Sequence, residues 1–547
     1  MYYEGDDMQA TAEQTQTVAD IIVHQLEIWG VKFVYGIPGE TELAIVDAIR
    51  RSENIKFILV RHEQVAAFMA SAYAKLTGDV GVCLTIAGPG ATNLITGLYD
   101  AKMDRAPVLA LTGQIGLQFI GTGAFQEIDQ HALFEAVSDF NHIIDSPEQA
   151  PELMVLAMKR SLIDGIVSHL GIPKNVQNAP IAPNLRVKPK EGRLPDRKSM
   201  PPLDMIDTAV NAIAAAKKPV IVVGYGACGQ RDTILKIAEK IGAPIATTYK
   251  AKGLVPEDHE LAVGVTGNIG TDASKRVVYG ADLLLVVGSS FAEHTSLPSY
   301  IKTVQIDIDP MMIGRKFPIH VGLLGDVSVI LPELLKKLPE MKNEKYLEQV
   351  AAIKKQWEEK KQREIESDTV PIRGPQIMRA LQDLVEPDAI ISNDIGDNAL
   401  WFGRNFVATN QTILISGYVG SMGFGLPAAL SAKLTFPEKQ VVCTTGDGGF
   451  TMVMGDFATA VANDLPITVV LLNNGKLDMI EYEQDEGRYP HFATDLSQID
   501  FAKYAECCGG LGFKVQHPKE LRDTLKQALS SKKPSIVDIV TDPRRRW

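Results

Sequence analysis

Short apolar runs alternate with helical stretches along most of the chain. In the first third the runs are FVYG (33–36), KFILV (56–60), VGVCLTIAG (80–88) and PVLALTG (107–113). The first three are each followed by a turn and then by a stretch with helical periodicity. Near-continuous apolar runs of this length, separated by helices, are typical of parallel strands in a sheet that is covered on both faces.

The same alternation returns twice further along the chain. Apolar runs recur at 219–229, 243–249, 282–290 and 303–310, and again at 389–397, 440–449, 466–475 and 534–542. We therefore predict an α/β protein of three successive domains, each with a mainly parallel sheet flanked by helices. The predicted domains span residues 1–185, 202–340 and 370–547.

Two stretches between the predicted domains lack the alternation. Residues 186–202 are basic and rich in proline, which indicates a linker. Residues 341–368 are densely charged and predict a helical connector. A length of 547 residues agrees with three or four domains at about 150 residues each.

Composition and charge narrow the class of protein. Apolar residues make up 45% and charged residues 22%, as in soluble globular proteins. A net charge of −12 argues against nucleic acid or an anionic membrane as the main partner. Five cysteines without framework spacing indicate a reducing compartment. The polar start resembles no signal peptide, and no apolar run approaches the ~18 residues of a membrane-spanning helix, so we expect a cytoplasmic protein.

A glycine-rich turn in the last third is the strongest chemical signal. Gly446, Asp447, Gly448 and Gly449 follow a predicted strand and precede a predicted helix, so backbone amides there can approach an anion. Asn474 stands at the end of the next predicted strand. Neighbouring strand ends allow Asp447 and Asn474 to share one ion, and their oxygens suit Mg²⁺ beside a diphosphate. A tight turn next to a polar strand end is the alternative.

The spacing of GDG and NN resembles the signature of the thiamine diphosphate (ThDP) enzymes, and the resemblance extends along essentially the whole chain. It implies that ThDP is held between a pyrimidine-binding and a diphosphate-binding domain of different subunits, in a homodimer at least and usually a homotetramer. In RHEQ (61–64) it implies that Glu63 hydrogen-bonds N1′ of the aminopyrimidine and is the catalytic residue that activates the cofactor. Without the resemblance, a glutamate at a helix start is often only a favourable dipole contact.

The resemblance assigns further residues to the cofactor and its metal. The backbone carbonyl of Gly420 would hold the 4′-amino group, and Met422 would separate the two rings. The backbone carbonyl of Lys476 would complete the metal shell. The other implied ThDP-binding residues are Gly39, Gly396, Gly448, Gly449, Leu477 and Ile480. Taken alone, residues 420–427 are equally typical of a helix start with a core methionine.

Within this family, stretches of the first domain resemble pyruvate oxidase and acetolactate synthase. These stretches are AGPG (87–90), GLYDA (97–101), APVLALTGQ (106–114) and GTGAFQE (121–127). The last implies that Phe125 and Gln126 contact the bound 2-oxo acid, although by themselves they could be a core aromatic and a surface amide. The helix predicted over 146–162 favours pyruvate oxidase.

The predicted central domain resembles the flavin domain of the same two enzymes. Residues 224–229 form a GxGxxG after a strand, but the next strand ends without the acidic residue of an NAD site. The resemblance instead implies FAD, with Gly224 and Gly226 near its pyrophosphate and Asp307 and Asp326 on its ribose and adenine. Thr248, Gly288 and Ile308 complete the implied flavin site.

By resemblance, we expect ThDP- and Mg²⁺-dependent decarboxylation of pyruvate, with oxidation of the hydroxyethyl intermediate by FAD to acetyl phosphate or acetate. The first alternative is an acetolactate synthase, which joins two 2-oxo acids. An alternative of another class is a non-catalytic paralogue acting as a binding subunit, which Glu63, Asp447 and Asn474 argue against. The sequence stops at RRRW (544–547) without the amphipathic tail of quinone-reducing pyruvate oxidases, so we expect no stable membrane association.

Overall fold

The computed structural model describes residues 16–182 and 184–543. The polar N-terminal segment and the final RRRW, which carried the expectations about a signal peptide and a membrane tail, lie outside the described residues. The chain divides into two compact units, residues 1–194 and 195–547. Within the described residues, no helix is both long and apolar enough to cross a membrane.

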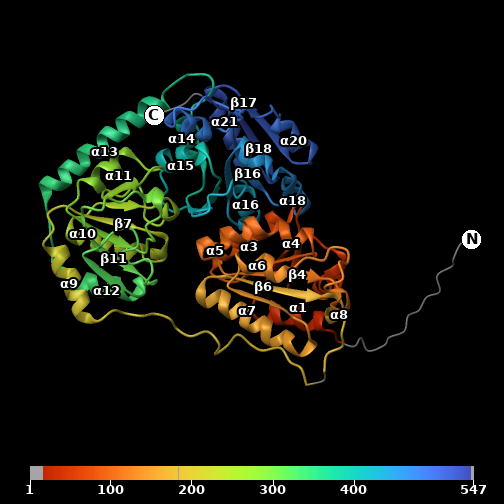
Figure 1. The fold of residues 1–547 in the computed structure, drawn as a ribbon. Helices are drawn as coiled ribbons and strands as arrows, with labels where there is room; N and C mark the ends of the chain where they lie inside the picture. Colours follow the sequence, from red (N-terminus) through yellow and green to blue (C-terminus); the bar gives the residue numbers. More distant parts are fainter. Residues whose placement is uncertain (1–15, 183, 544–547) are drawn as a thin grey trace, which may run out of the picture. The chain divides into compact units, whose positions relative to one another are not determined.

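The first unit is built on one six-stranded sheet in which every strand pair is parallel (Figure 1). Its strands are β1 (Phe33–Gly36), β2 (Lys56–Leu59), β3 (Gly81–Thr85), β4 (Val108–Gln114), β5 (Phe140–Ile143) and β6 (Val167–Pro173). Its helices are α1 (Val18–Ile28), α2 (Leu43–Arg51), α3 (Glu63–Thr77), α4 (Pro89–Asn93), α5 (Ile95–Asp104), α6 (Gln130–Glu135), α7 (Ala150–Asp164) and α8 (Lys174–Gln177). The strand order is β2-β1-β3-β4-β6-β5.

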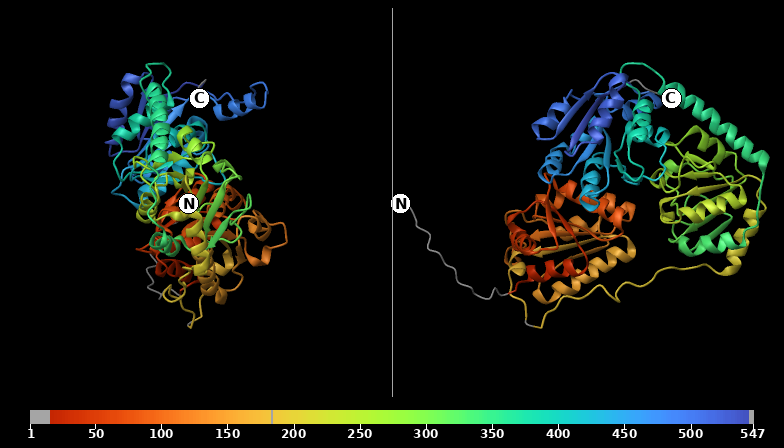
Figure 2. Two further views of the ribbon diagram at one scale, coloured as in Figure 1. Left: turned by 90° about the vertical axis from the view of Figure 1, so that its left-hand side faces the viewer. Right: turned by 180° about the vertical axis from the view of Figure 1, so that it is seen from behind.

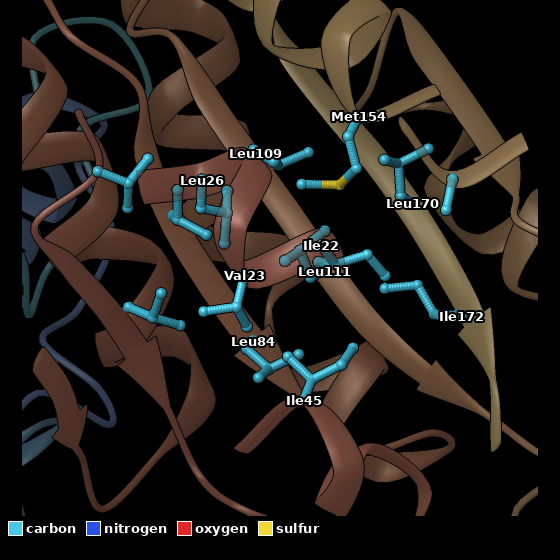
Figure 3. Packing of buried hydrophobic residues seen from close by; sticks show 14 of the residues in the cluster. Ile22, Val23, Leu26, Ile45, Leu84, Leu109, Leu111, Met154, Leu170 and Ile172 are labelled. Carbon is cyan, nitrogen blue, oxygen red and sulfur yellow. The ribbon is translucent and has the colours of Figure 1, made fainter. Parts of the chain in front are cut away.

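Helices pack on both faces of this sheet because its central strands are apolar on both faces. All seven residues of β4 are buried. Helices α1 and α7 cover one face, and α3 and α5 cover the other (Figure 1). Ile22 and Leu26 of α1 and Met154 of α7 pack against Leu109 and Leu111 of β4 (Figure 3). Burying each such side chain stabilises the fold by about 1.5–3 kcal/mol.

The second unit contains two further parallel sheets (Figure 2). The strands of its central sheet are β7 (Pro219–Val223), β8 (Ile245–Thr247), β9 (Ala262–Val265), β10 (Leu283–Val287), β11 (Lys302–Asp307) and β12 (Val321–Leu324). The accompanying helices are α9 (Leu203–Ala214), α10 (Arg231–Ile241), α11 (Asp272–Tyr279), α12 (Val327–Lys337) and α13 (Glu344–Ile365). The order β12-β11-β10-β7-β8-β9 places β7 beside β10, as in dinucleotide-binding folds with strand order 3-2-1-4-5-6.

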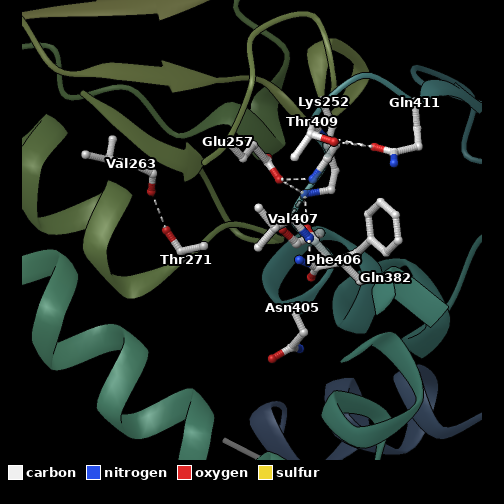
Figure 4. Close-up of polar contacts among 12 residues, drawn as sticks. Lys252, Glu257, Val263, Thr271, Gln382, Asn405, Phe406, Val407, Thr409 and Gln411 are labelled. Atoms are coloured by element: carbon white, nitrogen blue, oxygen red, sulfur yellow. Dashed lines mark hydrogen bonds and ion pairs between the residues drawn. The ribbon is translucent and has the colours of Figure 1, made fainter. Parts of the chain in front are cut away.

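The last sheet repeats the order of the first, as β14-β13-β15-β16-β18-β17. Its strands are β13 (Ile390–Asn393), β14 (Thr412–Ile415), β15 (Val441–Gly446), β16 (Ile467–Asn473), β17 (Leu511–Val515) and β18 (Ser535–Val540). Its helices are α14 (Gly374–Leu384), α15 (Asp397–Asn405), α16 (Gly425–Thr435), α17 (Asp447–Thr451), α18 (Phe457–Ala462), α19 (Asp478–Glu486), α20 (Phe501–Cys507) and α21 (Pro518–Leu529). The two parts of the second unit share buried contacts: Lys252, which is paired with Glu257 in the central part, donates to the backbone carbonyl of Phe406 after α15 (Figure 4).

These sheets confirm the predicted α/β class and parallel arrangement. The charged connector is confirmed as α13, and residues 186–202 contain no helix or strand. Six strands of the described chain fall outside the predicted apolar runs, namely β5, β6, β9, β12, β14 and β17. Five of them are edge strands. Of these, β5 and β17 are only partly buried and carry no strong apolar signal, whereas β9, β12 and β14 are apolar but only four residues long. The inner strand β6 is fully buried but contains polar residues and glycine.

Candidate functional site

Each sheet reverses its strand order between two of its inner strands, and the predicted site residues follow these strands or others of the same sheet. The reversal lies between β1 and β3 in the first unit. In the second unit it lies between β7 and β10 and between β13 and β15. In open parallel sheets, ligands bind outside the carboxyl ends of the strands at such a reversal. Asp447 and Gly224 follow strands at such a reversal, β15 and β7, and Glu63 follows β2, the neighbour of β1.

Glu63 is the first residue of α3, directly after β2 and its turn. Its side chain is 9% exposed, and Asn93 Nδ2 donates to Glu63 Oε2 over 2.9 Å. A Cβ atom at Gly90 would lie 2.7 Å from Ile86 Cγ2, so glycine allows α4 to pack closely on Ile86, and 3.5 Å from Glu63 Oε1, an ordinary contact distance. The structure thus places a buried carboxylate with one amide partner near the reversal of the first sheet.

Glu42, which the sequence analysis did not single out, is a second buried carboxyl in this region. Its side chain is fully buried, and Thr41 Oγ1 donates to Glu42 Oε2 over 2.9 Å. Burial raises the pKa of Glu42 to about 7, the hydroxyl of Thr41 lowers it, and the charge of Glu63 adds to the rise. A buried glutamate inside an amphipathic stretch gives no sequence signal beyond its charge. Nearby, Gly39 packs so tightly on Ile86 that a Cβ atom would lie 2.4 Å from it.

The loop that carries Phe125 and Gln126 is closed by Glu127. The Glu127 carboxylate accepts hydrogen bonds from the backbone amides of Gly121, Gly123 (2.8 Å) and Ala124 (3.0 Å). Phe125 is 85% exposed in this unit, so the alternative of a core aromatic is wrong. Gln126 has a φ of 63° and lies against Gly88, where a Cβ atom would be 3.0 Å from Gln126 Cβ. Backbone in this left-handed region is uncommon outside glycine and is held by its surroundings.

Asp447 and Asn474 lie at adjacent strand ends in the second unit, as predicted. Gly446 pairs with Leu472 in the register of β15 and β16. The amide of Gly475 donates to Asp447 Oδ2 over 2.9 Å, and burial raises the pKa of Asp447 to about 6. Asn474 Oδ1 accepts from the amide of Lys476 over 3.0 Å. A buried carboxylate that gains no neutralising side chain is suited to a cation.

The side chain of Lys476 points to other partners. Its Nζ lies 2.6 Å from Glu481 Oε1 and 2.9 Å from Asp495 Oδ1, which agrees with an assignment that uses only its backbone carbonyl. No group of three or more His, Cys, Asp and Glu side chains arranged for a metal occurs among the residues that the structure describes. A magnesium ion at Asp447 would therefore need oxygens from the amide, the backbone and a bound phosphate.

The structure brings Met422 and Leu477 together over the glycine turn. A Cβ atom at Gly448 would lie 3.0 Å from Leu477 Cδ2 and 3.2 Å from Met422 Cε. Gly420 has a φ of 64° and open space where a Cβ atom would stand. Ile480, on the following helix α19, is 43% exposed. The helix expected after the turn is interrupted: α17 ends at Thr451 and α18 begins at Phe457, with Gly455 between them.

Asp394, directly after β13, is a further buried acid. It is 1% exposed and accepts from the amide of Gly423 over 3.0 Å and from Thr445 Oγ1 over 2.9 Å. Burial raises its pKa to about 6, and its hydrogen-bond donors lower it. Gly396, predicted to bind the cofactor, precedes α15 as its N-cap residue.

In the central sheet, the glycines predicted for FAD lie in two turns, after β7 and after β10, and these turns contact each other. A Cβ atom at Gly224 would lie 2.2 Å from the carbonyl oxygen of Gly288, and the amide of Gly226 donates to that oxygen over 2.9 Å. The close approach of these two turns explains why glycine is needed at 224.

The polar residues predicted for FAD surround the same reversal. Thr248 follows β8, and its amide donates to Val223 O over 2.8 Å. Asp307 Oδ1 accepts from the amide of Asp309 over 3.0 Å. Asp326 Oδ1 accepts a hydrogen bond from the backbone amide of Ser328, and Asp326 thereby caps the N-terminus of α12. Ile308 is 48% exposed.

Three family models match the chain in succession. Residues 16–133 match the N-terminal thiamine pyrophosphate (TPP) binding domain of thiamine pyrophosphate enzymes, residues 206–334 their central domain, and residues 394–539 their C-terminal TPP binding domain. A Bacillus subtilis protein named "Putative thiamine pyrophosphate-containing protein YdaP" is 38% identical over 96% of this chain and 92% of its own. The chain belongs to the thiamine pyrophosphate enzymes.

Relatives with named activities point to more than one reaction among thiamine pyrophosphate enzymes. The acetolactate synthase large subunit of Corynebacterium glutamicum is 34% identical over 98% of this chain and 89% of its own. The pyruvate oxidase of Lactiplantibacillus plantarum is 30% identical over 97% of this chain and 90% of its own. The predicted membership of this enzyme group is thereby confirmed, while the specific reaction and the roles of individual residues stay predictions.

Proposed function

We propose that this thiamine pyrophosphate enzyme decarboxylates pyruvate and oxidises the two-carbon product to acetyl phosphate or acetate, as a pyruvate oxidase does. The observation that carries the proposal is the presence, in one chain, of buried Glu63 at the reversal of the first sheet and buried Asp447 at that of the last. When bound, ThDP supplies a nucleophilic carbon and an electron sink for loss of carbon dioxide.

The residues of the last sheet fit the diphosphate end of this cofactor. Asp447 and Asn474 would hold Mg²⁺ through side-chain oxygens and Lys476 through its backbone carbonyl. Without side chains at Gly448 and Gly449, backbone amides of the turn would be able to approach phosphate oxygens, and Met422 and Leu477 supply an apolar surface above the turn. Gly420, Gly396, Gly449 and Ile480 complete the proposed binding surface.

Glu63 is the proposed catalytic residue. Its carboxylate has one described amide partner, Asn93, and is otherwise enclosed, which favours a hydrogen bond to a cofactor ring nitrogen over hydration. By holding a proton at that nitrogen, the carboxylate would promote removal of a proton elsewhere on the cofactor. Gly39 lies in the same unit, and Phe125 and Gln126 would contact the 2-oxo acid.

FAD is the proposed electron acceptor, bound by the central sheet. Support comes from the strand order of dinucleotide-binding folds and from the position of Gly224, Gly226 and Gly288 at the strand-order reversal. Thr248, Asp307, Ile308 and Asp326 follow the neighbouring strands or begin the next helix.

We further propose a cytoplasmic homotetramer, with a homodimer as the minimum. Large exposed apolar side chains support association, among them Phe125 at 85%, Phe492 at 80% and Tyr489 at 69% exposed. All five cysteines are free, which supports a reducing compartment.

Acetolactate synthesis is the second candidate. It is favoured by the identity to acetolactate synthases, 34% for that of Corynebacterium glutamicum against 30% for the pyruvate oxidase. In this case the two-carbon unit would join a second 2-oxo acid instead of losing electrons.

Product analysis separates the two candidates. Purified protein would be incubated with ThDP, Mg²⁺, FAD and pyruvate, with and without phosphate and oxygen. Acetyl phosphate or acetate, together with bleaching of bound FAD by pyruvate under anaerobic conditions, is the expected result. Acetolactate without bleaching would support the second candidate. Absence of any pyruvate turnover would contradict both.

A further inference from the structure

The carboxylate of Asp394 stands where three segments of the last sheet meet. Asp394 directly follows β13, and its amide donates to Thr444 O on β15 over 2.9 Å. Its side chain is 1% exposed. The position is the strand-order reversal of this sheet, beside the turn that carries Asp447.

The carboxylate accepts hydrogen bonds from all three segments, namely the residues after β13, the 420–425 segment and the end of β15. Oδ1 accepts from the amides of Ile395 over 2.8 Å and of Gly423 over 3.0 Å. Oδ2 accepts from Thr445 Oγ1 over 2.9 Å and is 3.3 Å from the amide of Gly423. Hydrogen bonds to an ionised acceptor are about twice as strong as neutral ones, so this group can fix the backbone around it.

The same side chain explains two glycines of the motifs. A Cβ atom at Gly449 would lie 2.9 Å from Asp394 Oδ2, and one at Gly425 would lie 3.1 Å from Asp394 Cβ. These glycines therefore make room for Asp394. The carboxylate is packed between the glycine turn and the 420–425 segment. A side chain at Gly449 or Gly425 would crowd Asp394.

We propose that Asp394 is a positioning residue for ThDP, which holds the 420–425 segment in register with the 446–449 turn. The segment carries Gly420 and Met422, and Met422 Cε would be 3.2 Å from a Cβ atom at Gly448, so a shift of the segment changes the surface above the turn. The effect of Asp394 is exerted through the amide of Gly423 and the hydroxyl of Thr445. The inference rests on the cofactor of the family, and it holds for oxidation and carboligation alike.

The test compares three variants of the full-length protein. Asp394→Asn preserves the volume of the side chain, but its NH₂ group cannot accept a hydrogen bond and would face either the amide of Gly423 or the hydroxyl of Thr445. Thr445→Val removes the hydroxyl that donates to Asp394 Oδ2 over 2.9 Å and that also lies 3.1 Å from Gly446 O. Asp388→Asn is the control, because Asp388 is exposed near the other end of β13 and pairs with Lys439 at 3.6 Å. ThDP affinity is measured by calorimetry at fixed Mg²⁺, and amide hydrogen exchange of residues 417–427 is measured in the cofactor-free protein.

We expect Asp394→Asn to weaken ThDP binding at least tenfold and to speed exchange in 417–427 while other strands keep their protection. Thr445→Val should weaken binding about threefold, and Asp388→Asn should leave both readouts unchanged. Affinity of Asp394→Asn within threefold of the unsubstituted protein overturns the proposal, whatever the exchange shows. If Asp394→Asn does not fold, an unchanged affinity of Thr445→Val overturns it. These outcomes leave the choice between oxidase and synthase untouched, because product analysis of the unsubstituted protein decides that separately.

Discussion

At the scale of single residues, the first unit contains two buried carboxyls with different environments. Glu63 has an amide donor in Asn93, whereas Glu42 has a neighbouring hydroxyl and an Oε1 atom without a hydrogen-bond partner. Burial without full pairing disfavours the charged form of a carboxyl. The proton occupancy of Glu42 therefore changes near neutral pH, whereas Glu63 is the carboxyl proposed to act on the cofactor.

Replacing Glu63 by Gln should leave ThDP bound but slow the exchange of its C2 proton about 100-fold or more, the scale of a lost proton-transfer group. Gln keeps the size of the side chain and cannot be a carboxylate base. Exchange of the bound cofactor with deuterated water is followed by NMR. Glu53→Gln, at an exposed position of the same unit, is the matched control. An unchanged exchange rate in Glu63→Gln would remove the catalytic assignment.

Glu42 predicts a dependence of stability on pH. Its pKa is about 7 in the fold against 4.5 for the ordinary side chain, so the folded state keeps a proton that the unfolded state loses between these values. Folding then takes up a proton, and the stability from this group falls as pH rises from about 4.5 to about 7. The difference amounts to about 3 kcal/mol.

Glu42→Gln is neutral at every pH and should gain stability relative to the unsubstituted protein as pH rises from 5 to 8. Urea midpoints at both pH values measure the change. Glu53→Gln serves again as the control. A difference between Glu42→Gln and the unsubstituted protein that is the same at both pH values would show that Glu42 is ionised throughout.

At the scale of elements, the loop of residues 121–127 is stabilised by hydrogen bonds to one of its own side chains. Three amides point at the Glu127 carboxylate, and these backbone hydrogen bonds lower its pKa. The loop presents Phe125 outward and Gln126 against Gly88. A single side chain therefore sets the shape of a segment proposed to contact the substrate.

Glu127→Gln should loosen this loop, because an amide nitrogen cannot accept hydrogen bonds. We expect faster hydrogen exchange over residues 117–128 and a several-fold higher KM for pyruvate, with ThDP affinity unchanged. Exchange by mass spectrometry and steady-state kinetics are the measurements. Glu135→Gln, an exposed substitution on α6, should change neither. Equal exchange in Glu127→Gln and the control would show that the loop is held by other contacts.

At the scale of the whole molecule, a buried ion pair of the central part bonds to the backbone that follows α15, and these hydrogen bonds join the two parts of the second unit. Lys252 Nζ lies 2.6 Å from Glu257 Oε2 and donates to Phe406 O over 2.7 Å (Figure 4). The amide of Ala408 donates to the same carboxylate oxygen over 2.9 Å. A second link is the hydrogen bond from Tyr249 Oη to Asn393 Oδ1, immediately before Asp394. The part built on the central sheet and the part built on the last sheet are thus fixed to each other within the unit.

Lys252→Met should destabilise the second unit by about 3–5 kcal/mol, because it leaves Glu257 buried without its cation. This corresponds to a melting temperature lower by on the order of 10 °C. The double variant Lys252→Met/Glu257→Gln should recover much of the loss, and calorimetric melting measures both. Lys337→Met, which breaks a surface pair with Asp207, is the control and should shift the melting by about 2 °C or less. A double variant no better than Lys252→Met would show that the charge of Glu257 is not what destabilises the single variant.

The sequence by itself determined the class of the fold and the positions of the motifs. Strands such as β4 and β10 are apolar along their whole length, and this pattern is readable because both faces of a parallel strand are buried. The turn at 446–449 and Asn474 were readable for a similar reason, since ligand-binding groups follow such strands directly. Edge strands such as β5 and β17 were not readable, because they are only partly buried.

Only the tertiary structure decided which distant residues meet. Asp394 contacts Gly423 and Thr445, and Lys252 contacts Phe406, across separations of 29, 51 and 154 residues. Nothing in the local pattern distinguishes Asp394 from any other acid in a loop, because its burial is produced by segments that the chain contributes later. Hydrophobic periodicity reports how each segment faces the core, whereas the partners of a buried polar group are set by the order in which the strands are arranged in the sheet.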